Sequence, residues 1–387
     1  MTFAYCTNIW SHHQGCVCRE LAKLLGNDFK MVMFQPLDCE WSKERIAMGW
    51  DLLPPDEPWC VGPPKNMQEL SGGGFGKYLL EADVAVVGIS PYMDMAIIKR
   101  RIKSGKLTFI MGERYFKRAR RWYDFLNPKQ WRRWIALHLL LAPRNVHFLT
   151  MNHWCADDLA FLRVCKGRTW RWGYLTDVSK NRPLDRRNDL VRIGWAGRMM
   201  PCKQVDMILK AVALLPSEVR RKCRVEILGE GEMKKQWQNV AKELGIDSVV
   251  EWGASKPHDE FLQWIRGIDI YAFPSNRIEG WGATLVEAMD AGCAVVANSE
   301  AGVTLEVIKD GANGYVFSDN DVGLMAKHLE ALIEDAGLRQ RFGCAAWKTI
   351  QKWSPKVGAE RISSLVSDLL AGGYGSSAYC GLCQNIR

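Results

Sequence analysis

The sequence predicts an α/β protein with two parallel sheets in series, each covered by helices on both faces. Its 387 residues suit two domains of ordinary size. Short β-rich apolar runs alternate with stretches of helical period, as in doubly wound sheets. A content of 48% hydrophobic and 25% charged residues is typical of a folded chain. We therefore expect two Rossmann-like domains that face a cleft.

The alternation is clearest in the second half of the chain. There we predict strands at 191–196, 224–228, 248–252, 269–273, 293–297 and 314–317. We predict helices at 203–214, 231–243, 258–266, 282–291, 303–308, 320–334, 336–350 and 356–370. In the first half we predict strands at 2–8, 29–34, 83–88, 107–111, 146–150 and 169–173. The stretch 180–189 lacks both periods and is the expected linker. The predicted parts are therefore 1–182, 183–355, a terminal helix at 356–371 and a flexible tail at 372–387.

The sequence also excludes several classes of protein. The first ten residues carry neither the basic region nor the cleavage site of a signal peptide. No apolar run approaches the roughly 18 to 20 residues of a membrane-spanning helix. Thirteen scattered cysteines indicate reduced thiols. The Cys380-x-x-Cys383 pair lacks the further ligands that zinc requires. We expect a cytoplasmic protein with no metal and no cofactor.

The net charge of +9 lies in the first half of the chain. Residues 1–185 hold 27 Lys and Arg against 18 Asp and Glu, and the remainder holds 25 against 25. Much of the excess lies between Lys99 and Arg133, where Trp122, Tyr123 and Trp131 are interspersed and Trp134 follows. The basic residues there are Lys99, Arg100, Arg101, Lys103, Lys106, Arg114, Lys117, Arg118, Arg120, Arg121, Lys129, Arg132 and Arg133. Such a surface fits an anionic membrane, where it would make the protein peripheral, and a solvated helical face is the alternative. We do not expect nucleic acid as a partner.

Ligands of open parallel sheets bind beyond the carboxyl ends of the strands. After the first strand of the second domain come Gly197 and Arg198, and Lys203 lies at the expected start of a helix. Two cations near a helix N-terminus can hold a diphosphate, because both the side chains and the helix amides attract phosphate. Ordinary basic residues at a helix start are the alternative.

The loop after the strand 269–273 gives the strongest signal. Gly280 and Gly282 allow the backbone to approach a ligand, and the amides from Trp281 through Ala283 to Thr284 begin a helix that can hold phosphate. Glu279 precedes this helix and can reach a sugar hydroxyl. Glu287, two turns along, can accept hydrogen bonds from both ribose hydroxyls. The alternative makes Glu279 a helix N-terminal acid and Glu287 an exposed helix residue.

Two further loops follow strands of the same domain. Gly229-Glu230-Gly231 is a weak signal that a tight turn explains. Gly253, after the strand ending at Trp252, is placed where a nucleobase could lie against the backbone.

Taken together, GRMMPCK, VEILGEGE, VVEWGASKPHDE, YAFPSNRIEGWGATLVEAMDAGCAVVAN and EVIKDGANGYVF resemble the C-terminal domain of glycosyltransferase family 4, which has the GT-B fold. The resemblance covers about residues 190–320. It implies a retaining enzyme in which Arg198 and Lys203 bind the donor diphosphate, Glu279 the sugar and Glu287 the ribose. The family more often has Phe where Trp281 stands and Gly where Gln204 stands. The last helix resembles one that crosses back to the first domain.

The first domain carries fewer signals. His12 and His13 follow its first strand, Glu113 follows the strand 107–111, and His153 follows the strand 146–150. Each could contact an acceptor, and helix capping and surface exposure are the alternatives.

We therefore expect a metal-independent hexosyltransferase that moves a sugar from a nucleotide-diphosphate sugar to a saccharide, in particular a lipid-linked or cell-surface polysaccharide intermediate. A nucleotide-sugar epimerase of the same fold is the main alternative. A dehydrogenase would need a Gly-x-Gly-x-x-Gly after a first strand, which is missing. A binding-only protein is the remaining alternative.

Overall fold

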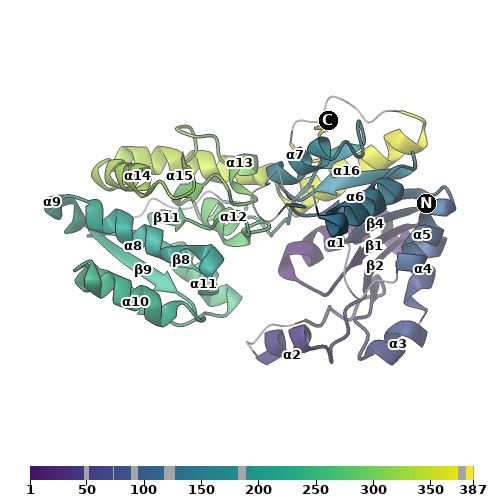
Figure 1. Cartoon of the computed structure of the whole chain (residues 1–387), viewed down its shortest axis with the longest axis horizontal. Coiled ribbons are helices and arrows are strands. Elements are labelled where there is room, and N and C mark those ends of the chain that lie inside the picture. Colours follow the sequence, from purple (N-terminus) through teal and green to yellow (C-terminus); the bar gives the residue numbers. More distant parts are fainter. Residues whose placement is uncertain are drawn as a thin grey trace. The chain divides into compact units, whose positions relative to one another are not determined.

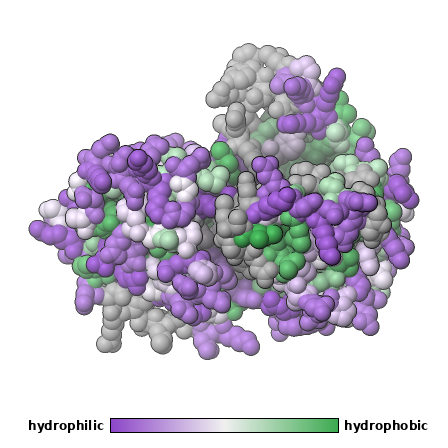
Figure 2. Space-filling view, turned by 90° about the horizontal axis from the view of Figure 1, so that it is seen from below, coloured by the Kyte–Doolittle hydropathy of each residue, from purple (hydrophilic) through white to green (hydrophobic). Residues whose placement is uncertain are grey.

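The computed structural model describes residues 1–47, 52–72, 74–88, 95–116, 127–181, 189–373 and 381–386. Within it the chain divides into two compact units (Figure 1). Unit 1 comprises Met1–Asp177 and Trp353–Arg387, and unit 2 comprises Val178–Lys352. On the face shown in Figure 2 hydrophilic residues predominate, and hydrophobic residues form only local patches.

Unit 1 contains a seven-stranded sheet in the order β3-β2-β1-β4-β5-β6-β7, in which every pair of neighbouring strands is parallel. Its strands are β1 (Phe3–Thr7), β2 (Phe29–Met33), β3 (Cys60–Val61), β4 (Val84–Gly88), β5 (Leu107–Gly112), β6 (Val146–Thr150) and β7 (Thr169–Arg171). Its helices are α1 (His12–Leu25), α2 (Glu40–Ala47), α3 (Met67–Gly72), α4 (Phe75–Glu81), α5 (Met95–Lys103), α6 (Pro128–Leu141), α7 (His153–Phe161) and α16 (Pro355–Leu370). Helices α4, α5, α6 and α7 share one hydrophobic core with one face of this sheet. Helix α16 packs on α1.

Unit 2 contains a six-stranded sheet in the order β10-β9-β8-β11-β12-β13, again parallel throughout. Its strands are β8 (Val191–Ala196), β9 (Cys223–Leu228), β10 (Val250–Gly253), β11 (Ile270–Phe273), β12 (Ala294–Asn298) and β13 (Tyr315–Phe317). Its helices are α8 (Val205–Leu214), α9 (Ser217–Arg220), α10 (Lys234–Glu243), α11 (His258–Ile265), α12 (Ala283–Asp290), α13 (Thr304–Val307), α14 (Val322–Glu334) and α15 (Ala336–Gln351). The predicted class of two doubly wound parallel sheets is confirmed.

The chain enters unit 2 at Val178, ahead of the predicted boundary at 182/183, because Ser179 is bound inside unit 2. Its amide donates to both carboxylate oxygens of Asp290 at 2.9 and 3.0 Å, and its hydroxyl donates to Oδ2 at 2.7 Å. Its carbonyl accepts from Trp347 Nε1 and Gln351 Nε2. Burial raises the pKa of Asp290, while the bonds from Ser179 act in the opposite direction.

The prediction of a flexible tail is wrong for residues 381–386. This segment pairs with the edge strand β7: Cys383 N donates to Arg171 O at 2.8 Å, Arg171 N to Gln384 O at 3.0 Å, and Ile386 N to Thr169 O at 3.1 Å. Trp170 and Asn385 form an antiparallel bridge, and the Cys383 side chain is buried. The tail therefore satisfies backbone groups of β7 that an open edge would leave to water. Cys380 lies outside the described residues.

His147 in β6 makes the stability of unit 1 depend on pH. It is buried, and its Nδ1 accepts a hydrogen bond from Trp170 Nε1 at 3.0 Å. Burial, aided by the charge of Arg168, lowers its pKa to about 4. The unfolded chain takes up this proton near pH 6.5, so the stability is present above that pH and is lost as the pH falls toward 4.

We expect a loss of about 3 kcal/mol in unfolding free energy from this group between pH 7 and pH 4. Urea unfolding at several pH values measures it, with His147→Gln as the variant, because glutamine can accept the Trp170 bond without titrating. Parallel pH profiles for the two proteins would contradict the assignment.

Candidate functional site

The predicted site residues of unit 2 lie at the carboxyl ends of its strands, in loops that hold one another. After β8, Gly197 leads to the exposed Arg198, and a short 3-10 turn, Pro201–Lys203, precedes α8. The loop after β11 contacts this turn, because Asn276 N donates to Cys202 O at 2.9 Å. The chain thus brings the segment with both cations beside the segment with Glu279.

Lys203 and Glu279 form an ion pair between Nζ and Oε2, with both side chains largely buried. Burial raises the pKa of the Cys202 thiol, and the charges of Lys203, Glu279 and Arg198 are those that act on it. The printed contacts thus bring two of the three residues predicted to be catalytic together, and Arg198 lies five residues before Lys203 in the same loop. A carboxylate already pairs with one cation, so Lys203 has to share its charge with any bound phosphate.

The glycines after β9 hold the loop that carries Arg198. Gly229 and Gly231 have φ of +145° and +149°, and a Cβ on them would collide with the carbonyl oxygens of Gly197 and Met199 respectively. Met199 N donates to Glu230 O at 2.8 Å, and Met233 N to Met199 O at 3.0 Å. The tight turn predicted for this segment therefore also supports residues 197–203, the cation-bearing loop that holds Arg198 and Lys203.

Gly253 ends β10 beside the same group of loops. Its carbonyl accepts from Gly229 N at 3.1 Å, and a Cβ on it would collide with the side chain of Leu228. The residue is therefore fixed by packing, whether or not a nucleobase lies against it.

Gln204 occupies a left-handed conformation, with φ of +46° and ψ of +42°, at the residue before α8. Glycine adopts this conformation without steric cost, whereas other residues lose about 1 kcal/mol or more. This explains why glycine is the usual residue of the resembled family here. Because the local backbone keeps the left-handed turn with Gln204, the departure leaves Lys203 in place.

The start of α12 has the geometry of an anion-binding helix terminus. Gly282 precedes the helix with φ of +104°, and a Cβ there would collide with the ring of Phe273. Trp281 is buried, while Gly280, Ala283 and Thr284 are half-buried. The first amides of a helix have no partners within it, and they carry the positive end of its dipole. This helix start can therefore hold a phosphate.

Glu287 lies on α12 and is only 6% exposed, so the alternative of an exposed helix residue is wrong. Its Oε1 is 3.9 Å from Nδ1 of His258, the first residue of α11. The His258 ring stacks on Phe261. Sequence reasoning did not single out His258, because a polar residue at a helix start looks like ordinary capping. The structure places it beside the predicted ribose ligand.

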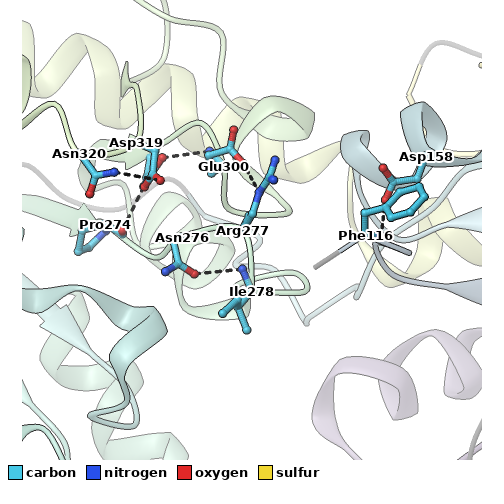
Figure 3. A network of polar contacts seen from close by, with 10 residues as sticks. Phe116, Asp158, Pro274, Asn276, Arg277, Ile278, Glu300, Asp319 and Asn320 are labelled. Carbon is cyan, nitrogen blue, oxygen red and sulfur yellow. Dashed lines mark hydrogen bonds and ion pairs between the residues drawn. The ribbon is translucent and has the colours of Figure 1, made fainter. Parts of the chain in front are cut away.

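A network behind the β11–α12 loop fixes its position (Figure 3). Asn298, buried at the end of β12, donates to Pro274 O at 3.3 Å and to Asp319 Oδ1 at 3.1 Å, and it accepts from Glu300 N at 3.0 Å. Glu300 in turn pairs with Arg277 Nε at 2.9 Å. The loop that carries Glu279 is therefore tied to the ends of β12 and β13.

Replacing Asn298 with alanine is expected to cost about 2 to 3 kcal/mol of unfolding free energy, because it leaves buried backbone groups without partners. We also expect weaker donor binding, since the loop loses its support. Urea unfolding and a donor titration measure the two effects. Asn239→Ala, an exposed position on α10, is the matched control and should change stability by less than about 0.5 kcal/mol. Equal effects of the two variants would contradict the bracing role.

The Asp319-Asn320-Asp321 segment takes part in structure. Asp319 accepts from Asn298 and from Asn320 Nδ2, and Asp321 caps α14 by accepting from Leu324 N at 2.9 Å. In the described ranges no three His, Cys, Asp or Glu side chains are grouped so that they could hold a metal ion.

In unit 1 the structure brings two of the four predicted acceptor residues together around Tyr174. Glu113 Oε1 accepts from the Tyr174 hydroxyl at 3.3 Å, and the His13 ring lies 5.8 Å from the Tyr174 ring. Burial raises the pKa of Tyr174, and the charge of Glu113 adds to this effect. Tyr174 carried no sequence signal, because it follows a strand of only three residues.

The other two histidines are placed differently. His153 begins α7, is partly exposed and faces Asp157 Oδ2 at 3.5 Å. His12 is the first residue of α1, and its side chain lies outside the described part of the chain. Arg114, beside Glu113, is buried over the Trp154 ring at 4.9 Å.

The basic region between residues 99 and 133 is only partly a surface. Arg101 is fully buried and donates to the carbonyls of Leu79, Ala82, Asp83 and Leu107. Burial lowers its pKa to about 10. Arg101 and Arg114 therefore do not contribute to a surface patch, which corrects the prediction for these two residues. Lys117 to Arg121 lie outside the described residues. None of the described helices is long and apolar enough to cross a membrane.

Comparison with known proteins finds relatives of the second half of the chain. Residues 180–349 match the family model described as Glycosyl transferases group 1. The D-inositol 3-phosphate glycosyltransferase of Corynebacterium efficiens is 31% identical over 181 residues, which are 46% of this chain and 42% of that protein. The corresponding protein of Streptomyces avermitilis is 32% identical over 160 residues, 39% of this chain and 34% of that protein. The chain thus matches only about two fifths of the length of these curated relatives.

Solved structures resemble nearly the whole chain. The Anabaena protein Alr3699/HepE in complex with UDP has a TM-score of 0.67 at 14% identity and covers 95% of this chain and 100% of its own. The lipopolysaccharide outer core galactosyltransferase WaaB has a TM-score of 0.66 at 15% identity, with the same coverage. At such identities the likeness shows the fold alone. Residues 180–349 are therefore similar to the Glycosyl transferases group 1 family, within a chain that has the GT-B fold.

Proposed function

We propose that this protein is a retaining glycosyltransferase, of the family 4 kind, that moves a hexosyl group from a nucleotide-diphosphate sugar to a saccharide acceptor. One observation carries the proposal: Lys203 pairs with Glu279, which precedes α12, and the loop that holds Lys203 also carries Arg198. Two cations and a helix N-terminus suit a diphosphate, and a carboxylate between them suits sugar hydroxyls. Glu287 is the proposed ribose ligand.

Uridine diphosphate is the donor nucleotide that we propose to test first. Several structures with this fold are complexes with UDP, and one is described as containing UDP and glucose. In this chain, Gly253 would lie against the base, Glu287 would accept from the ribose, and the amides of Ala283 and Thr284 would face the phosphates.

The proposed chemistry is front-face transfer. The bond between the sugar anomeric carbon and the diphosphate oxygen breaks, and the electron pair leaves with the diphosphate. The acceptor hydroxyl attacks from the same face, and its proton passes to the leaving phosphate oxygen. Fixed positive charge at Arg198, Lys203 and the α12 amides stabilises the charge that develops, which is usually the largest catalytic term. This scheme requires no metal ion, because side chains and amides supply the positive charge.

The proposed acceptor is a lipid-linked or cell-surface polysaccharide intermediate, which would bring a cytoplasmic protein to the inner face of the membrane. WaaB, by its name, acts in the lipopolysaccharide outer core. The relatives named for D-inositol 3-phosphate match too little of their length to carry that acceptor over. His13, Glu113 and Tyr174 form the polar cluster of unit 1 where we place acceptor contacts. The family match favours transfer over the epimerase alternative.

A screen of nucleotide sugars tests the proposal. A true donor should raise the melting temperature, by linkage, and should release its nucleoside diphosphate when an acceptor is supplied. NMR of the product should show the same anomeric configuration as the donor, and EDTA should leave the rate unchanged. Conversion of donor alone to an isomer, or an inverted product, would refute the proposal. Inhibition by EDTA that Mn²⁺ reverses would refute its metal-independent form.

A further inference from the structure

Helix α6 carries large apolar residues on two sides, and its inner side supplies its contacts with the core. On the inner side, Trp134, Leu137 and Leu141 join the core beneath the sheet of unit 1. Trp134 Nε1 donates to the carbonyl of Leu162 at 3.2 Å, and His138 Nε2 lies 2.8 Å from the same oxygen. The inner side therefore anchors the helix on its own unit, and from the outer side the Trp131 ring meets the Trp134 ring edge-on, with 5.4 Å between centroids.

The outer side carries an apolar stripe of three large residues. Trp131 and Ile135 are each 48% exposed, and Leu139 is 73% exposed. Residues four apart lie on the same side of a helix, so these three side chains form one continuous row. An amphipathic helix on a globular surface normally places polar residues there. Scattered exposed apolar residues are ordinary, whereas an aligned row of this size indicates a contact surface.

Exposed positive charge lies on the same helix and on α5. Lys129, Arg132 and Arg133 on α6 are exposed. So are Lys99, Arg100 and Lys103 on α5, which packs into the same core on the same face of the sheet. In the described residues 95–116 and 127–141, Glu113 is the only acidic residue. A partner for this face must therefore accept apolar side chains and also carry negative charge.

We propose that α6 docks the protein on an anionic lipid bilayer. Trp131, Ile135 and Leu139 enter the boundary between headgroups and acyl chains, and the cations of α6 and α5 contact lipid phosphates. An indole at headgroup depth beside lysine and arginine is the pattern of interfacial helices. A second copy of this chain would bring the same cations face to face, which disfavours self-association. A nucleic acid would leave Ile135 and Leu139 without partners.

Co-sedimentation of the full-length protein with sucrose-loaded vesicles tests the docking. Vesicles of three parts phosphatidylcholine to one part phosphatidylglycerol should bind the wild type, and vesicles of phosphatidylcholine alone should bind it at least about tenfold less. The double variant Ile135→Ser/Leu139→Ser should lower the partition coefficient about tenfold or more. The pair Arg132→Glu/Arg133→Glu should abolish the preference for anionic vesicles.

Matched controls come from unit 2. Leu214→Ser removes an exposed leucine, 63% accessible, and Lys235→Glu/Lys242→Glu reverses two exposed charges on α10. Neither should change vesicle binding by more than about twofold. Melting temperatures of the α6 variants should match the wild type, because the substituted side chains lie outside the core.

The proposal is overturned if the wild type does not bind anionic vesicles, or if the controls lose binding as the α6 variants do. It is also overturned if the α6 variants only convert a dimer to a monomer in sedimentation velocity. Docking does not depend on the transfer reaction. Nucleotide-sugar binding without vesicles should be unaffected in the α6 variants, so that failure of one proposal leaves the other standing.

Discussion

Replacing Lys203 or Arg198 with alanine is expected to lower turnover by about 100-fold or more at saturating donor. Both cations are proposed to face the leaving diphosphate, and their effect grows as negative charge develops in the transition state. Loss of Lys203 also leaves the half-buried Glu279 carboxylate without its partner. Turnover is measured as release of nucleoside diphosphate with donor and acceptor both saturating.

Lys210→Ala is the control for this prediction. Lys210 lies on α8 close in sequence to Lys203, is exposed, and pairs only with Asp206 at 2.7 Å among the ion pairs described. Its loss should change turnover less than about twofold, because exposed pairs on helices contribute little. Near-normal turnover of Arg198→Ala and Lys203→Ala, or an equal loss in Lys210→Ala, would contradict the proposal that Arg198 and Lys203 stabilise the leaving diphosphate.

Gly229→Ala is expected to have the largest effect on folding among the site substitutions. The residue has φ of +145°, and a Cβ on it would collide with the Gly197 carbonyl oxygen, a backbone atom that cannot move by rotating a side chain. We expect a loss of about 3 kcal/mol or more in unfolding free energy and loss of donor binding. Urea unfolding and a donor titration measure these effects.

Gly245→Ala separates conformational strain from collision. Gly245 has φ of +64°, and a Cβ on it would have open space around it. The cost there should be only the left-handed conformation, about 1 kcal/mol. Equal losses of unfolding free energy in the two variants would contradict our account, in which close packing of the loop after β9 on residues 197–199 requires glycine at position 229.

Most strands could be predicted because they are buried apolar runs, and in unit 2 these runs alternate with stretches of helical period. Besides the helix bounds of unit 1, two features were not predicted. Strand β3 is only two residues long, Cys60–Val61, and carries no pattern. Residues 381–386 pair with β7 through backbone groups, so no pattern in their side chains indicates this pairing. The boundary at Val178 depends on the contact of Ser179 with Asp290, which lies 111 residues away in sequence.

Within the candidate site, distinctive spacing marks some residues in the sequence, whose roles stay predictions, and leaves others unmarked. Glu279 and Glu287 were predicted by their separation around two glycines. His258 and Asn298 have neighbours only in three dimensions, so no local pattern marks them. The charge run at 99–133 shows the opposite error, because its composition assigns Arg101 and Arg114 to the surface although both are buried. Arg101 donates to backbone carbonyls, and Arg114 lies over the Trp154 ring.

Titration calorimetry with UDP and with uridine tests the central claim, that the cation-bearing loop and the start of α12 hold a diphosphate. The wild type should bind UDP at least about tenfold more tightly than uridine, because the phosphates meet Arg198, Lys203 and the helix amides. In the double variant Arg198→Ala/Lys203→Ala this advantage should shrink to about twofold or less. An undiminished preference for UDP in the variant, or none in the wild type, would contradict the account.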